Sequence, residues 1–88
     1  MVTLTYTAGE RMAYMISEHQ AHDDVVVRIK FTKDGVEIQP DKMRPGDETF
    51  DHNGNVVLVL DQPTSLLLDN KTIDLMTDDD GSHLVIID

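Results

Sequence analysis

Hydrophobic and polar residues alternate along several short stretches of this chain, and the alternation predicts β-strands. Residues 25–31 show it best: one face of the expected strand is apolar, whereas Arg28 and Lys30 share the other face. Residues 56–60 are all apolar, which predicts a strand that is covered on both faces. The other expected strands are 2–6, 36–39, 48–51, 72–76 and 84–87, the last of them buried.

Helical spacing is found in two places. Thr7 and Glu10 match a capping box, so a helix is expected to follow and to end near residue 19. Apolar and amphipathic residues at spacings of three and four would form its inner face: Ala8, Met12, Met15, Ile16 and His19. A second, short helix is expected after Asp61, with Pro63 in its first turn.

Turn residues connect most of these elements. Asp34-Gly35 and Asn53-Gly54 are pairs favoured in two-residue hairpins, and Pro40 with residues 44–46 indicates a loop. Because tight turns join antiparallel strands, we expect one mainly β domain over residues 1–88. About seven short strands would form a compact antiparallel barrel or sandwich, with the N-terminal helix covering one side.

Composition narrows the function. The chain has 88 residues, no cysteine and a formal net charge of −10, which disfavours nucleic acid as a partner. It has neither an apolar run long enough for a membrane span nor the pattern of a signal peptide, so we expect a cytoplasmic protein. Glycine-rich phosphate loops and a nucleophile elbow are also missing from the sequence, and we expect no enzymatic activity.

The charge is unevenly distributed. Residues 1–44 hold six basic and seven acidic residues (−1), whereas residues 45–88 hold one basic and ten acidic residues (−9). We expect a candidate surface for an anionic partner, such as the acidic half of a second copy, at five basic residues: Arg28, Lys30, Lys33, Lys42 and Arg44. The alternative is ordinary surface charge, because exposed ion pairs contribute little.

A metal site is a second candidate. His19 and His22 are three residues apart and are followed by Asp23, and on one helical turn such groups could share a divalent ion. The alternative is that they are surface residues near a helix end. The run of aspartates at 78–80 lacks the alternate spacing of a calcium loop and is expected to be a solvated turn.

Three stretches, in order, resemble the HesB-like family, the A-type carriers of iron–sulfur cluster assembly. Residues 4–11 (LTYTAGER) are similar to its opening strand and capped helix, and Gly46-Asp47 with 53–59 (NGNVVLV) to its acidic hairpin and buried strand. Residues 59–68 (VLDQPTSLLL) followed by 71–75 (KTIDL) are similar to its strand, short Ser-Leu helix and Ile-Asp strand. The resemblance covers nearly the whole chain and implies the family's fold.

The resemblance also implies what this sequence lacks. The family holds iron or a cluster through three cysteines, one in a loop after the strand equivalent to 25–31 and two near the C-terminus. Here that loop is 32–35 (TKDG), and residues up to Asp88 supply no cysteine pair. We therefore expect no cofactor and a non-enzymatic accessory or interaction protein, with cluster-assembly proteins or a second copy as partners. The alternative function is a small metal-binding module that uses His19, His22 and Asp23.

Overall fold

A computed structural model describes residues 1–19, 25–33 and 35–88 of the chain. The described part contains seven strands and two helices, and the bounds of these elements follow in chain order. They are β1 (Thr3–Leu4), α1 (Tyr6–His19), β2 (Val25–Thr32), β3 (Gly35–Lys42), β4 (Glu48–His52), β5 (Asn55–Leu60), α2 (Gln62–Leu67), β6 (Thr72–Asp78) and β7 (Gly81–Ile87). The prediction of a mainly β domain with a long first helix and a short second helix is confirmed.

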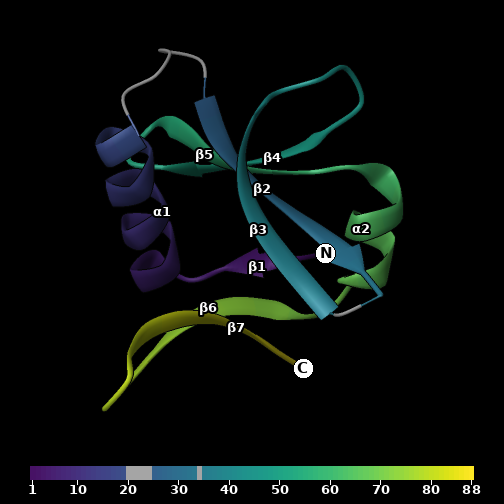
Figure 1. The fold of residues 1–88 in the computed structure, drawn as a ribbon. Coiled ribbons are helices and arrows are strands. Elements are labelled where there is room, and N and C mark those ends of the chain that lie inside the picture. Colours follow the sequence, from purple (N-terminus) through teal and green to yellow (C-terminus); the bar gives the residue numbers. More distant parts are fainter. Residues whose placement is uncertain (20–24, 34) are drawn as a thin grey trace.

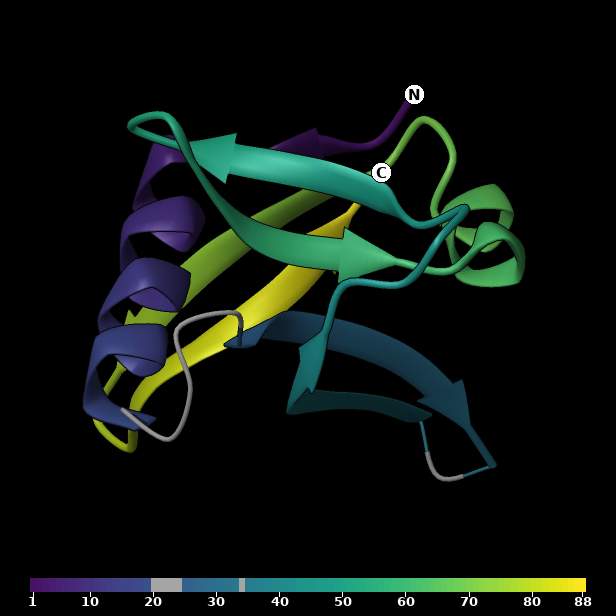
Figure 2. The same cartoon turned by 90° about the horizontal axis from the view of Figure 1, so that it is seen from above.

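The strands form two sheets, which Figures 1 and 2 show from two sides. One sheet has the order β3-β2-β5-β4 and the other the order β1-β6-β7. Three of the five strand pairings are antiparallel, but β2 with β5 and β1 with β6 run parallel. The prediction of a barrel or sandwich is confirmed only in part: in the described residues the strands form two separate sheets and no closed barrel, because β1, β3, β4 and β7 remain edges of their sheets.

Apolar residues of both sheets and of α1 meet in one core. Ala8 and Met12 on α1 are buried, as the helical spacing predicted, and they share the core with Ile73 of β6. The expected two-sided burial of β5 is confirmed over residues 57–60. The prediction that residues 84–87 form a buried strand is wrong. They belong to the edge strand β7, which is half-buried and ends on the exposed Ile87.

The first helix begins earlier than the capping box predicted. Thr5 is its N-cap: Thr5 Oγ1 accepts a hydrogen bond from the Ala8 amide at 3.2 Å and donates one to Asp74 Oδ1 at 2.7 Å. Thr7 lies inside the first turn of α1, so its predicted capping role is wrong. The reason is tertiary: β1 pairs with β6 through only two residues, and Asp74 of β6 holds the Thr5 hydroxyl where the chain leaves that pairing.

This correction gives a test of the helix start. Replacing Thr5 with alanine is expected to lower the free energy of unfolding by about 1–2 kcal/mol, because it removes the cap and the bond to Asp74. Thr7→Ala is the matched control and is expected to change it by less than about 0.5 kcal/mol. Urea unfolding followed by circular dichroism measures both. A larger loss for Thr7→Ala would show that the cap is assigned to the wrong threonine.

One hairpin turn and the cap of the second helix agree with the sequence predictions. Asn53 and Gly54 have φ angles of 52° and 86° and close the β4–β5 hairpin as expected. Asp61 caps α2 by accepting from the Thr64 amide at 2.9 Å, and hydrogen bonds from Thr64 lower the pKa of this carboxyl. In the β2–β3 hairpin, the register pairs Thr32 with Gly35, and the predicted turn residue Asp34 lies outside the described residues.

Pro40 was expected in a loop, but it lies within β3, opposite Val27 of β2. A proline has no amide hydrogen, so it is tolerated in a sheet where that position points away from the neighbouring strand. β3 is an outer strand of its sheet and offers such positions. The strand therefore continues through Pro40 as far as Lys42.

Candidate functional site

Arg28 does not lie on the surface. Arg28 is only 1% exposed, so the prediction that it shares an outward, solvated strand face with Lys30 is wrong. The polar face of β2 is covered at this point by the end of β3 and the connection to β4, which bring Asp41 and Asp47 onto the guanidinium. A long-range contact therefore buries a residue whose local pattern indicated exposure.

The guanidinium is bound on all its polar sides. Arg28 Nε donates to Asp41 Oδ2 at 2.7 Å, Nη1 donates to Asp47 Oδ1 at 3.2 Å, and Nη2 donates to Asp47 Oδ2 at 2.6 Å. Nη2 also donates to the carbonyl oxygen of Lys42 at 3.0 Å. The pair with Asp47 is bidentate, which matches the planar fork of arginine to the two carboxylate oxygens.

The carboxylates of this cluster are also held by backbone amides. Asp47 Oδ2 accepts from the Arg44 amide and Asp41 Oδ1 from the Lys42 amide, each at 2.8 Å. The Arg28 guanidinium lowers the pKa of Asp47, and the Lys42 amide is the main cause of the lowered pKa of Asp41. The hydrogen bond to Asp47 raises the pKa of Arg28 although burial opposes it. The cluster is a charged clamp that ties the β3–β4 connection to the sheet.

The structure divides the other basic residues of the expected surface into two groups. Lys30 and Lys33 lie at the hairpin end of β2 and β3, whereas Lys42 and Arg44 lie at the opposite end of β3. Eight strand residues separate these ends, which is roughly 25 Å. Arg44 is exposed and pairs with Asp41 at 3.2 Å. Binding of an anionic partner by either group stays a prediction.

Most of the predicted metal site lies outside the residues that the structure describes. His19 ends α1, but His22 and Asp23 belong to the segment 20–24, which lies outside the described residues. Within residues 1–19, 25–33 and 35–88, no group of three or more His, Asp or Glu side chains is placed to hold a metal ion. The candidate site therefore stays a prediction from the sequence.

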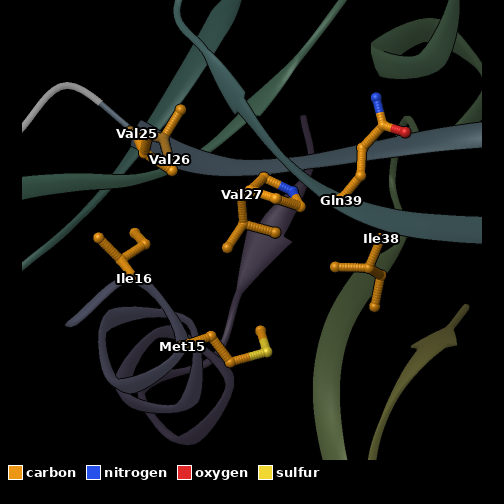
Figure 3. A pocket seen from close by; sticks show the side chains of 8 residues that line it. Met15, Ile16, Val25, Val26, Val27, Ile38 and Gln39 are labelled. Atoms are coloured by element: carbon orange, nitrogen blue, oxygen red, sulfur yellow. The ribbon is translucent and has the colours of Figure 1, made fainter. Parts of the chain in front are cut away.

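Three cavities with mainly apolar walls lie along β3. Figure 3 shows the first, where Ile38 and Met15 face a space of about 140 Å³ between β3 and α1. A second cavity, of about 190 Å³, lies between β3 and the β6–β7 pair and shares Ile38 with the first. A third, of about 450 Å³, is lined by the β2–β3 hairpin, α2 and the end of β7, and shares Val36 and Ile86 with the second.

We call the second and third cavities together the β3 groove. Its walls are mainly apolar, with Lys71 and Asp88 at one end, and the main apolar lining side chains are Phe31, Val36, Ile38, Leu67, Leu84 and Ile86. Four of these six are among the large hydrophobic residues that the fold leaves exposed. The sequence predicted that Phe31 would share the buried face of its strand, but this residue is exposed and lines the third cavity beside α2 and the end of β7. The alternation of Val36 and Ile38 in an otherwise polar strand was the available signal for the groove.

Comparison with solved structures supports the resemblance in fold. Escherichia coli SufA, described as involved in the biosynthesis of iron–sulfur clusters, matches with a TM-score of 0.78 at 16% identity, over 97% of this chain and 82% of that chain. The chain has the HesB-like fold. IscA, solved with its [2Fe-2S] cluster, matches with a TM-score of 0.67 at 14% identity, over 98% of this chain and 83% of that chain. No family model and no curated protein sequence matches this chain.

The resemblance put one of the family's cysteines in the loop at 32–35 and the other two near the C-terminus. The third cavity is lined by Phe31 and Val36, on either side of that loop in the sequence, and by Asp88. None of the 88 residues is a cysteine. This end of the molecule instead has an apolar surface and an ion pair between Lys71 and Asp88.

No helix in the described part is long and apolar enough to cross a membrane.

Proposed function

We propose that this chain is a non-enzymatic, cytoplasmic accessory protein of iron–sulfur cluster biogenesis that acts by binding other proteins. It shares the fold of SufA and IscA, but thiolates are the usual ligands of such clusters and the chain offers none. The observation that carries the proposal is the end of the molecule formed by Phe31, Val36 and Asp88. Apolar side chains and the ion pair between Lys71 and Asp88 line this end, and it offers no thiolate. Cluster-assembly proteins are the proposed partners.

Cluster reconstitution and pairwise binding test this proposal. The purified chain is incubated without oxygen with ferrous iron, sulfide and a thiol reductant, then desalted, with IscA treated in parallel as the positive control. We expect no protein-bound iron or sulfide on this chain. Calorimetry with individually purified cluster-assembly proteins from the same organism is expected to give saturable binding to at least one. A stoichiometric cluster on the chain, or no binding to any of these proteins, would reject the proposal.

A further inference from the structure

The outer edge of β3 has backbone groups directed away from the sheet. Pro40 lies opposite Val27 and has no amide hydrogen, so its position is one of those that point away from β2. The direction of the amide and carbonyl groups is the same every second residue along a strand, so Val36 and Ile38 also direct theirs outward. In the described part of the chain no strand pairs with this edge. It is therefore a template for one more strand.

The β3 groove lies directly beside this edge. Val36 and Ile38 contribute their side chains to the groove while their backbone groups face outward. β7, the edge of the second sheet, forms the opposite wall with Leu84 and Ile86. A strand added to β3 would therefore place every second side chain into an apolar groove that is already open.

We propose that an extended segment of another protein binds here as an added strand, with apolar side chains in the β3 groove and a lysine or arginine on its outer face. The proposal rests on the proposed function, that the chain acts by binding proteins, and identifies the surface and the kind of segment. Glu37 is exposed on β3 between Val36 and Ile38 and points to the side opposite the groove. Its carboxylate would therefore lie beside the outer face of the added strand and favour a lysine or arginine there. The net charge of −10 also attracts a cationic segment and repels an acidic one.

A second copy of this chain fits the edge poorly. In a symmetric antiparallel pair, the register that joins Val36 to Ile38 of the copy places Glu37 opposite Glu37, and like charges opposite one another destabilise a pair. The register centred on Ile38 places Val36 opposite Pro40, which cannot donate. The register centred on Val36 joins only residues 35–37 of the strand. Each copy also adds ten net negative charges, so a different protein is the favoured occupant.

A titration with designed peptides tests the proposal. The probe is a capped seven-residue peptide that alternates valine with lysine, added to the ¹⁵N-labelled chain and followed by NMR amide shifts. Saturable shifts are expected at Val36 and Ile38 and around the groove. Two control peptides are a block sequence of the same composition and a peptide alternating valine with glutamate. Both are expected to bind at least about tenfold more weakly, because one loses the alternation and the other faces Glu37.

Variants of the β3 edge distinguish strand addition from non-specific hydrophobic binding. Ile38→Pro removes one outward donor but stays apolar, and it is expected to weaken binding about fivefold, the effect of one hydrogen bond. Glu37→Lys keeps the groove and is expected to reverse the preference between the lysine and glutamate peptides. Tyr14→Lys, on the exposed face of α1, is the matched control and is expected to leave the affinity unchanged.

Three results would overturn the inference. The first is the absence of saturable shifts at Val36 and Ile38, and the second is binding that neither Ile38→Pro nor Glu37→Lys alters. The third is a dimer in sedimentation that Ile38→Pro dissociates, which would assign the edge to a second copy. These results are distinct from failure of the proposed function. A chain that binds a cluster-assembly protein with unchanged affinity after Ile38→Pro keeps its proposed function and loses this site.

Discussion

Replacing Arg28 with methionine is expected to lower the free energy of unfolding by about 3–5 kcal/mol. The substitution keeps an apolar stem in place but removes the cation from the clamp, and Asp47 then loses the bidentate partner of its buried carboxylate. An unpaired buried charge costs several kcal/mol, whereas domains of this size are stable by only about 5–10 kcal/mol. Urea unfolding at neutral pH measures the effect, and we expect the midpoint to fall by about half.

Two further variants show whether the loss comes from the buried pair. Arg44→Met removes a cation that is 60% exposed and also contacts Asp41, and it is expected to cost less than about 1 kcal/mol. Arg28→Lys is expected to restore only part of the stability, because a lysine ammonium cannot bind both oxygens of Asp47 and reach Asp41 at once. Equal losses for Arg28→Met and Arg44→Met would contradict the buried clamp.

The burial of Arg28 could not be predicted from the sequence. The alternation in β2 correctly indicated which side chains share its face, but it could not show what covers that face. The covering carboxylate, Asp47, lies 19 residues further along the chain, after β3 and a loop. Nothing in the local pattern of residues 25–31 encodes this contact. The same holds for Thr5, whose role as the helix cap depends on Asp74, 69 residues away.

Three features that depend on neighbouring residues were predicted correctly. The apolar run of β5 predicted burial on both faces, Asn53-Gly54 predicted its hairpin, and Asp61 predicted the start of α2. Each of these signals lies within a few neighbouring residues. The open sheet edges and the parallel pairings depend on how distant strands meet, whereas the strand pattern alone indicated mainly antiparallel pairing and left a barrel and a sandwich both open.

Only the part of the candidate site that depends on residue identity could be predicted from the sequence. The lack of cysteine is read directly from the sequence, and together with the resemblance it indicated that cluster ligands are missing. The β3 groove was not predicted, because it arises where the β2–β3 hairpin, α2 and β7 meet, and these elements are far apart in the sequence. Whether Phe31 or Val36 is covered depends on which distant elements pack against it, and the alternation within its own strand does not show this.

The leucine run of α2 gives a direct test of this limit. Leu67 and Leu68 are neighbours of identical chemistry, yet Leu67 is 61% exposed beside the groove and Leu68 is 1% exposed in the core. Leu68→Ala is expected to lower the free energy of unfolding by about 2–5 kcal/mol, because it leaves a cavity among well-packed side chains. Leu67→Ala is expected to change it by less than about 0.5 kcal/mol. Thermal and urea unfolding of the two variants compare positions that the sequence does not distinguish. Similar losses at both would mean that α2 packs on the sheets through a different face, and the third cavity would then lose one of its walls.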